Sequence, residues 1–336
     1  MSGKDNFIFV GEDDGYAECK QVTSLGDTSR EPSQAKAGEV SAISLSSKQS
    51  RSFGYRTNDG PYVAGDIRNP DTTAFDDYPF SAMNRVVVAH TLRQSGIDPN
   101  AKIVMCSGLP LKKYYIGTKL NKDYIGRKRE NLLRNDVVAV DGTPIPKVFK
   151  HYIGCEGILA WIDLVIHRNA DGHLEMDRDR AESRIAIVDI GGRTTDIALI
   201  DGGELDMEKS TTIDQGMLSI KQQLAEQVHA KFNVQVNMGA LNKAMETGNI
   251  KLFGEEVDVS DLIKQSKQTT LSRIEAETKR LLNNASDIDE VVFVGGTAAA
   301  ASDLIEGWFR NQVIGDDPGF ANARGACKNA ELMFRR

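Results

Sequence analysis

Hydrophobic and polar residues alternate along this chain in blocks that predict layers of strands and helices. Short apolar runs that end in glycine, proline or aspartate predict buried strands, at residues 6–10, 102–111, 187–200 (two strands around a turn) and 289–298. Apolar residues at helical spacing predict helices, at residues 81–94, 122–134, 155–167, 218–232, 271–285 and 298–308. Because strands and helices alternate throughout, the pattern indicates an α/β protein.

Weaker patterns lie between these elements. Residues 137–140 and 147–149 predict two more strands, with Asp141 and Gly142 as the hairpin turn between them. Residues 21–52 are polar and are typical of short exposed strands or a mobile loop. Residues 168–183 are polar too and are expected to connect two domains. At 336 residues the chain exceeds the usual size of one core, so we expect two domains, or one split by a cleft.

Composition narrows the class of protein. Hydrophobic residues make up 40% of the chain and charged residues 26%, as in globular proteins with a real core. The 41 basic and 48 acidic residues leave a net charge of −7, which argues against a protein that coats nucleic acid by charge alone. The four cysteines are far apart, which argues against a zinc site or a disulfide framework. No stretch approaches the ~18 apolar residues of a membrane span, so we expect a cytoplasmic protein without a membrane partner.

Three glycine-bearing turns follow apolar strands, at residues 11–20 (G-E-D-D-G-Y-A-E-C-K), 189–196 (D-I-G-G-R-T-T-D) and 294–298 (V-G-G-T-A). Backbone N–H groups of a glycine turn can form a concave anion site, because no Cβ blocks the ligand. Thr194 and Thr195 could add hydroxyl donors, and Lys20 could supply a charge to a β- or γ-phosphate. Any one of these turns could serve hairpin geometry alone. Three in this order favour a phosphate site.

The aspartates of these turns need a different explanation, since carboxylates repel phosphate. Asp13 and Asp189 make sense if Mg²⁺ lies between them and the phosphates, held mainly through water. Asp14 and Asp196 could instead brace the turns. A Rossmann G-x-G-x-x-G and a Walker A loop are both absent from the sequence, so the phosphates would be held between two β-hairpins. The similar units near residues 13 and 189 predict two related halves that face each other across a cleft.

These hairpins, together with V-G-G-T-A, resemble the actin, Hsp70 and sugar-kinase superfamily. More closely, D-D-G-Y-A-E-C-K, I-V-M-C-S-G-L-P-L-K-K-Y-Y, D-I-G-G-R-T-T-D and F-A-N-A-R-G resemble the ParM, or StbA, family of actin-like ATPases that segregate low-copy plasmids. The order and spacing of these stretches hold from about residue 7 to 333. The resemblance implies an actin-like α/β fold, with two related domains flanking a nucleotide cleft. We expect domain I at residues 1–180, with a C-terminal return at 312–336, and domain II at 181–311.

The resemblance also implies roles for individual residues. The first phosphate loop would comprise Asp14, Gly15, Tyr16, Ala17 and Lys20, and the second Gly191, Gly192, Arg193, Thr194 and Thr195. The adenosine side would be formed by Gly216, Gly295, Gly296 and Thr297. Asp13 and Asp189 would hold Mg²⁺ through water. Glu156 and Asp189 would be the catalytic residues, with Glu156 orienting the attacking water.

Some of these positions keep a second interpretation. Glu156 could simply begin the helix predicted at 155–167, where the helix dipole favours a carboxylate. Cys155 stands where the family usually has proline, and Tyr16 stands where actins carry serine. Arg193 replaces a threonine of many relatives and could either touch phosphate or point to solvent.

The leading hypothesis is therefore a hydrolase of ATP, or also of GTP, that forms a helical homopolymer. By resemblance, its other partner would be an adaptor protein bound to a plasmid's centromere-like DNA, and no direct sequence-specific DNA binding is expected. A small-molecule kinase on the same scaffold is one alternative, although the sequence offers no convincing carboxylate base for it. A nucleotide-binding scaffold with little hydrolysis is the other.

Overall fold

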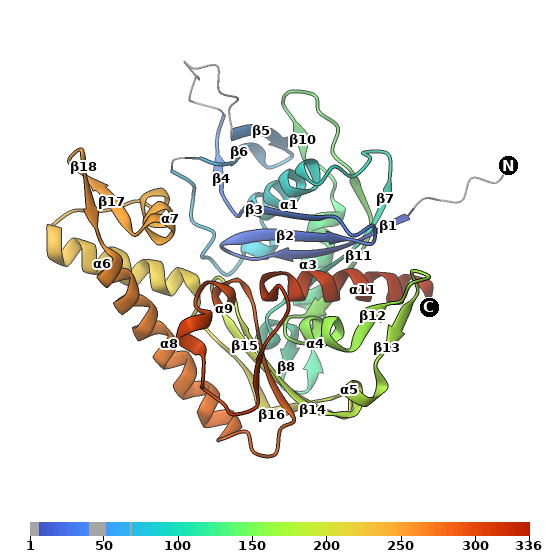
Figure 1. The fold of residues 1–336 in the computed structure, drawn as a ribbon. Helices are drawn as coiled ribbons and strands as arrows, with labels where there is room; N and C mark the ends of the chain where they lie inside the picture. The colour runs from blue at the N-terminus through green and yellow to red at the C-terminus, as the bar shows by residue number, and fades with distance from the viewer. Residues whose placement is uncertain (1–6, 40–51, 68) are drawn as a thin grey trace.

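The computed structural model of the protein describes residues 7–39, 52–67 and 69–336 (Figure 1). The first residue of the strand predicted at 6–10 and much of the polar segment 21–52 lie outside these ranges. In the part of the chain that the structure describes, no helix is both long and apolar enough to cross a membrane.

The first half of the molecule is built on a five-stranded sheet in the order β11-β7-β1-β2-β3. Its strands are β1 (Phe7–Asp14), β2 (Glu18–Thr23), β3 (Thr28–Pro32), β7 (Lys102–Leu109) and β11 (Lys147–Cys155). The first three form an antiparallel meander, and β7 and β11 continue the sheet in parallel on the other side of β1. Almost every residue of β1 and β7 is buried, which explains their continuous apolar runs.

The second half repeats this plan in a sheet of order β16-β15-β14-β19-β20. Its strands are β14 (Arg184–Ile190), β15 (Thr195–Asp201), β16 (Glu204–Ile213), β19 (Glu290–Val294) and β20 (Gln312–Ile314). Again an antiparallel meander of three strands is followed by two parallel strands beside the first one. The two halves are therefore related, as the repeated turns in the sequence predict.

Smaller sheets extend both halves of the molecule. A four-stranded sheet extends the first half, with β4 (Ala35–Ala37), β5 (Ser52–Thr57), β6 (Gly60–Gly65) and β10 (Val138–Ala139). Three two-stranded hairpins complete the sheets of the described residues, β8–β9 (Tyr115–Ile116 and Lys119–Leu120), β12–β13 (Ile166–Arg168 and Leu174–Met176) and β17–β18 (Asn249–Leu252 and Glu255–Asp258).

The hairpin predicted across Asp141 and Gly142 is wrong. β10 pairs with β5 in the small sheet, whereas β11 pairs with β7 in the central sheet. The strands part because β11 carries apolar residues, among them Val148 and Ile153, that are buried beside β7. The chain still turns here, since the Gly142 N–H donates to the Ala139 carbonyl oxygen at 3.1 Å, but burial of β11 beside β7 outweighs its pairing with β10.

Helices cover the sheets and connect them (Figure 1). They are α1 (Ala82–Gln94), α2 (Leu111–Tyr114), α3 (Lys122–Leu133), α4 (Ile158–Val165), α5 (Arg178–Glu182), α6 (Met217–Phe232), α7 (Met238–Thr247), α8 (Ser260–Leu282), α9 (Gly296–Ala300), α10 (Ser302–Ile305) and α11 (Ala321–Arg335). Two 3₁₀ turns lie at Tyr78–Phe80 and Pro318–Phe320.

The helices predicted at 81–94, 122–134 and 218–232 are confirmed. Ser81 caps the first of them, since its hydroxyl accepts a hydrogen bond from the Asn84 N–H at 3.1 Å. The pattern at 271–285 marks only the second part of α8, and the helix predicted at 298–308 is divided into α9 and α10. The helix predicted at 155–167 is shortened to α4, because β11 reaches Cys155 and the chain after α4 becomes β12.

Helix α11 lies between β1 and α4 (Figure 1). A Cβ on Gly11 would lie 1.8 Å from the Ala323 carbonyl oxygen, and one on Gly325 would lie 1.7 Å from the Leu159 carbonyl oxygen. Glycine at both positions lets α11 contact its neighbours backbone to backbone. The C-terminal helix thus packs on the first half, while β20 belongs to the second sheet. The division into residues 1–180 with 312–336, and 181–311, stays a prediction.

Candidate nucleotide-binding site

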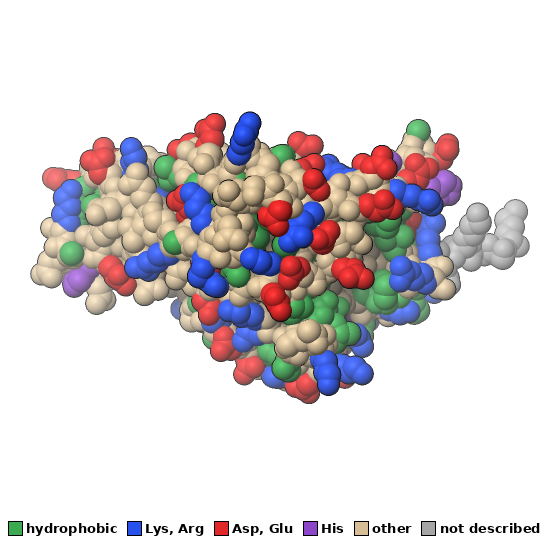
Figure 2. Space-filling view, turned by 90° about the horizontal axis from the view of Figure 1, so that it is seen from below, with side chains coloured by type: hydrophobic (Ala, Val, Ile, Leu, Met, Phe, Trp, Pro, Cys, Tyr) green, Lys and Arg blue, Asp and Glu red, His purple; other side chains and the backbone are tan. Residues whose placement is uncertain are grey.

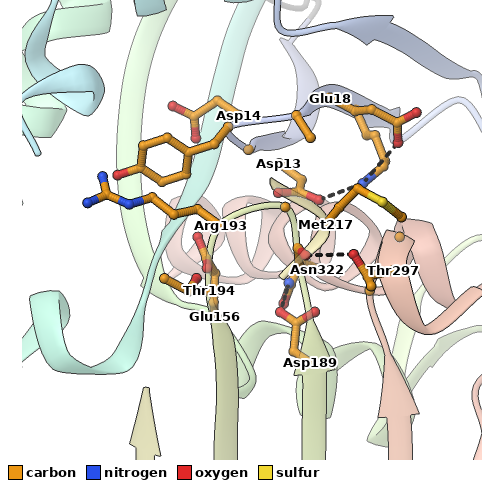
Figure 3. Close-up of a pocket in the computed structure, with 18 of the residues that line it drawn as sticks. Asp13, Asp14, Glu18, Glu156, Asp189, Arg193, Thr194, Met217, Thr297 and Asn322 are labelled. Carbon is orange, nitrogen blue, oxygen red and sulfur yellow. Dashed lines mark hydrogen bonds and ion pairs between the residues drawn. The ribbon is translucent and has the colours of Figure 1, made fainter. Parts of the chain in front are cut away.

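A cavity of about 550 Å³ lies between the two halves (Figure 3). Its volume falls within the range of sites for small ligands. Four turns that are far apart in the sequence form its wall: those between β1 and β2, β11 and α4, β14 and β15, and β19 and α9. All of them follow the carboxyl ends of strands, the usual place for a site in an α/β sheet.

Most of the residues predicted from the sequence line this cavity, namely Asp13, Asp14, Gly15, Tyr16, Ala17, Lys20, Glu156, Asp189, Gly191, Gly192, Arg193, Thr194, Gly295, Gly296 and Thr297. Two predicted residues do not. The hydroxyl of Thr195 is buried and donates to the Gln215 carbonyl oxygen at 2.9 Å. Gly216 lies behind the second turn, where a Cβ would come within 2.5 Å of the Gly191 carbonyl oxygen. Both support the turn from behind.

In the first turn, β1 and β2 pair so that Asp13 stands opposite Lys20. Lys20 is only 5% exposed, and its Nζ lies 3.3 Å from Asp13 Oδ2 and 3.7 Å from Glu18 Oε2. Burial alone lowers the pKa of Lys20, but the two carboxylates outweigh it and raise the pKa above its ordinary value. The lysine is therefore charged and faces the cavity.

Asp14 points away from Asp13 and is held by two donors from helices. Its Oδ1 accepts from Lys128 Nζ at 2.7 Å, and its Oδ2 accepts from Asn84 Nδ2 at 2.7 Å. Lys128 also donates to the Gly108 carbonyl oxygen at 2.7 Å. This pattern agrees with the bracing role that the sequence left open for Asp14, since its carboxylate is occupied within the protein.

In the second turn, Asp189 lies at the end of β14 and reaches the cavity floor (Figure 3). Its Oδ2 accepts a hydrogen bond from Asn322 Nδ2 at 2.5 Å. Burial and the nearby charge of Asp13 raise the pKa of Asp189 to about 6. Gly295, with φ +96°, passes so close that a Cβ there would lie 2.4 Å from Asp189 Oδ1.

Asp196 braces the second turn on the opposite side. Its Oδ1 accepts from the Leu111 N–H at 2.7 Å and from the Thr212 hydroxyl at 2.5 Å. Burial raises the pKa of Asp196 to about 7, although these two hydrogen bonds oppose the rise. The side chain thus connects the second turn to α2 of the first half.

The turns of the two halves meet across the cavity. A Cβ on Gly192 would lie 2.9 Å from the Ala17 Cβ, so glycine permits this approach. The Arg193 guanidinium lies over the Tyr16 ring, 5.0 Å from its centroid, and its Nη2 is 2.9 Å from Asp76 Oδ1. Thr297 ties the third turn to the second, because its hydroxyl donates to the Gly191 carbonyl oxygen at 2.7 Å.

Glu156 lies between β11 and α4, ahead of the Gly157 that precedes the helix. Its N–H donates to the Leu109 carbonyl oxygen at 2.9 Å. Its side chain passes close over Gly108, where a Cβ would lie 2.8 Å from the Glu156 Cγ. Deep burial, followed by the charges of Asp196, Asp13 and Asp189, raises the pKa of Glu156 well above its ordinary value. The carboxyl faces the cavity, so beginning the helix does not account for its position.

The structure adds cavity residues that the sequence analysis did not select. Asn322 holds Asp189 and accepts from the Gly157 N–H at 3.4 Å, so it joins the two candidate catalytic turns. Asn322 belongs to the F-A-N-A-R-G stretch, and this membership was the feature of the sequence that could have pointed to it. Lys128, Glu18 and Met217 also line the cavity. No local sequence pattern pointed to these residues, because single charged or apolar residues on helices and strands are common.

The donor groups suit a magnesium ion that also binds phosphate. Among the described residues, no group of three or more His, Cys, Asp or Glu side chains could enclose a metal ion. Mg²⁺ does not need such a cage, since it commonly takes one or two carboxylates and fills its shell with water and phosphate oxygens. Asp13 and Asp189 line the same cavity, where a shared cation would relieve the repulsion that raises the pKa of Asp189.

Comparisons with known proteins agree with this geometry. The family model for the N-terminal part of plasmid segregation protein ParM matches residues 8–156, and the model for the C-terminal part of the archaeal actin homologue MreB-like family matches residues 187–306. No curated protein sequence matches the chain.

Three solved structures illustrate the similarity. The native archaeal actin homologue Ta0583 has a TM-score of 0.75 at 19% identity, covering 96% of this chain and 99% of that chain. Its complex with ADP gives 0.72 at 19% identity, with coverage of 96% and 99%. A 15-stranded ParM filament from Clostridium botulinum gives 0.76 at 18% identity, with coverage of 97% and 99%. At these identities the structures establish the actin-like fold.

Proposed function

We propose, from the premise that this chain belongs to the actin-like ParM family, that it is a filament-forming ATPase that segregates plasmid DNA in the cytoplasm. The observation that carries the proposal is the meeting of two acidic glycine turns, one from each half, at a single cavity that also contains Lys20 and Glu156. The similarity to Ta0583, which was solved in complex with ADP, supports nucleotide binding.

The chain would bind the phosphates with groups from both halves. Backbone N–H groups near Gly15, Gly191 and Gly192 would donate to phosphate oxygens, and the charged Lys20 would offset their charge. Asp13 and Asp189 would hold Mg²⁺ mainly through water, and that ion would neutralise charge on the β- and γ-phosphates. The adenosine would lie toward Gly296, Thr297 and the neighbouring α6–α7 region that borders the cavity.

Hydrolysis would depend on Glu156 as the residue that orients the attacking water. Positioning and electrostatic stabilisation supply most of the catalysis in phosphoryl transfer, so no covalent nucleophile is required. Asn322 would keep Asp189 and the Glu156 turn in register, since it bonds to both segments.

Loss of the γ-phosphate would remove the group that bridges the two turns, and the cleft would then open. This is a two-state switch controlled by a ligand. Subunits joined head to tail form a heterologous contact, which propagates as a helical polymer instead of closing. An adaptor protein bound to the plasmid's centromere-like DNA would capture the filament, and the net charge of −7 suits contact with DNA through such an adaptor.

The test combines sedimentation, phosphate release and calorimetry with Mg–ATP and Mg–GTP, with Mg–ADP as the control. We expect the triphosphate to produce pelletable filaments and phosphate release, and the diphosphate to produce neither. Phosphate transfer to a small molecule by protein that stays in the supernatant would favour the kinase. Tight nucleotide binding without phosphate release would favour the scaffold, and no binding at all would refute every nucleotide-based function.

A further inference from the structure

The β17–β18 hairpin carries an aromatic residue at its tip that the fold does not cover. Phe253 is 92% exposed, the highest value among the exposed large hydrophobic side chains of the described residues. Its backbone is left-handed, with φ +52°, and Gly254 follows with φ +94°. A left-handed conformation costs a bulky residue roughly 1 kcal/mol. Exposure and backbone strain together suggest that this phenylalanine serves a contact outside the subunit.

The same tip is acidic. Residues 249–258 (N-I-K-L-F-G-E-E-V-D) contain three acidic residues and one lysine. Glu255 and Glu256 directly follow Phe253 and Gly254, and both are exposed. Glu256 pairs with Lys243 at 3.6 Å, but both side chains are more than half exposed, so this pair is weak. The tip of the β17–β18 hairpin therefore exposes an aromatic ring beside carboxylates.

A complementary surface lies on the β8–β9 hairpin. Ile116 is 66% exposed and Leu120 is 47% exposed. Residues 111–122 (L-K-K-Y-Y-I-G-T-K-L-N-K) contain four lysines and no acidic residue, and Lys119 and Lys122 are exposed. Lys113 lies over the Tyr124 ring, and Asp123, just beyond the hairpin, removes part of the charge. The surface is apolar with a basic rim.

The two hairpins lie far apart on the molecule: β17–β18 is at the upper left of Figure 1, and β8 is in the lower half. Figure 2, the view from below, shows hydrophobic side chains exposed among charged side chains of both signs on the lower face. Two different surfaces that lie far apart on one subunit allow it to dock on the next in a repeating way.

We propose that these two hairpins form the longitudinal contact between successive subunits of this protein's filament. Phe253 of one subunit packs between Ile116 and Leu120 of the next, and Glu255 and Glu256 face Lys119 and Lys122. An aromatic anchor within a charged rim is the usual anatomy of a contact that carries binding energy. The opposite charges also set the direction of docking, because two identical ends repel each other. This inference rests on the proposed function, since it presupposes a polymer.

The first test measures the critical concentration for ATP-dependent assembly. Phe253→Ser and Ile116→Asp should each raise it at least tenfold, while ATP affinity, measured by calorimetry on the monomer, stays unchanged. Leu25→Ser is the matched control: Leu25 is 70% exposed in the turn between β2 and β3 and lies on neither hairpin, so its critical concentration should equal that of the wild type.

The second test reverses the charges. Glu255→Lys with Glu256→Lys should impair assembly, and so should Lys119→Glu with Lys122→Glu. The variant that carries all four changes restores opposite charges at every contact, and we expect its critical concentration to return toward the wild-type value. If the variant with all four changes assembles no better than either double variant, the proposed pairing of these charges is wrong.

The outcomes separate this inference from the proposed function. If Phe253→Ser or Ile116→Asp assembles normally, the proposed contact is wrong, but the proposal that the protein forms filaments still stands. Failure of the wild-type protein to assemble with any nucleotide would instead refute the proposed function itself.

Discussion

The guanidinium of Arg193 lies 5.0 Å from the centre of the Tyr16 ring, and the two residues belong to opposite halves of the molecule. Asp76, also in the first half, accepts from the same guanidinium at 2.9 Å. The sequence left two interpretations of Arg193, phosphate contact or a solvent-directed side chain. In the structure the Arg193 side chain contacts both Tyr16 and Asp76 beside the cavity. It therefore connects the second glycine turn to the first half of the molecule.

Removal of this bridge should speed nucleotide release. A cation–π contact of this kind contributes about 0.5–1 kcal/mol and an exposed ion pair about 0.2–1 kcal/mol. We therefore expect Arg193→Ala to raise the dissociation rate of a fluorescent ATP analogue about 3- to 30-fold in stopped-flow measurements. Asp76→Asn should have a smaller effect in the same direction.

The neighbouring Asp77 supplies the control for this prediction. It pairs with Arg127 instead of Arg193, so Asp77→Asn should leave the dissociation rate unchanged. An Arg193→Ala protein that releases nucleotide at the wild-type rate would show that the bridge does not hold the cleft.

Glu156 is expected to act in turnover and not in binding. Glu156→Ala should slow phosphate release by ~10²-fold or more, the usual loss when a positioned catalytic group is removed, and should give long-lived filaments. Calorimetry should find ATP affinity within about threefold of the wild type. Glu182→Ala, at the exposed end of α5, is the control and should behave as wild type. Unchanged turnover in Glu156→Ala would remove the catalytic role from this residue.

The buried carboxyls predict a pH dependence of stability. The pKa of Asp196 is about 7 in the folded protein against an ordinary value of 3.8, so the folded state binds its proton more tightly than the unfolded state does. Ionisation of Asp196 therefore destabilises the nucleotide-free protein fully above pH 7, and this penalty shrinks progressively as the pH falls from 7 toward 3.8.

Asp196→Asn removes this titration while keeping the shape of the side chain. We expect the Tm advantage of Asp196→Asn over the wild type, measured in EDTA without nucleotide, to shrink as the pH falls from 8 to 6. His151, whose pKa burial lowers to about 4, acts in the opposite direction in both proteins and cancels in the comparison. A difference in Tm that does not vary with pH would contradict the assignment.

Helix α11 should tolerate no side chain at Gly325. A Cβ there would lie 1.7 Å from the Leu159 carbonyl oxygen, and two backbones would have to move apart. We expect Gly325→Ala to lower the free energy of unfolding by about 3 kcal/mol in urea denaturation. Gly126 in α3 has open space around it, so Gly126→Ala should stabilise by about 0.5–1 kcal/mol. Equal effects of the two changes would contradict the packing.

Lys128 holds the brace behind the first turn. Lys128→Met would leave the buried Asp14 carboxylate without its cation, and breaking a buried pair in this way costs about 3–5 kcal/mol of unfolding free energy. Adding Asp14→Asn should recover part of this loss, because the uncompensated charge is removed. Lys122→Met, on the exposed first turn of the same helix, should change stability by less than about 0.5 kcal/mol. Lack of recovery in the double variant would argue against the pair.

Local chemistry explains what could be predicted. Ser81 marks the start of α1 because an N-cap hydroxyl acts within one helical turn. Asp13, Gly191 and Gly295 stand out because glycine and aspartate at the end of an apolar run are conspicuous in the sequence itself. Each prediction of this kind depends on contacts between residues that are only a few positions apart. Such contacts do not depend on how the rest of the chain folds.

Contacts between distant segments explain the rest. Thr194 lies in the turn just before β15 and lines the cavity, whereas Thr195, the first residue of β15, turns toward Gln215. No local pattern distinguishes Lys128 from other helical lysines, and it becomes a brace only when α3 packs beside Asp14.

The amino-acid sequence by itself determined the strands, the main helices and the glycine turns that form the cavity, because these depend on neighbouring residues. Only the tertiary structure decided that β10 and β11 part, that Asn322 and Lys128 join the site, and that Arg193 connects the halves. Those relationships depend on which distant surfaces are buried together, and burial is a property of the whole fold.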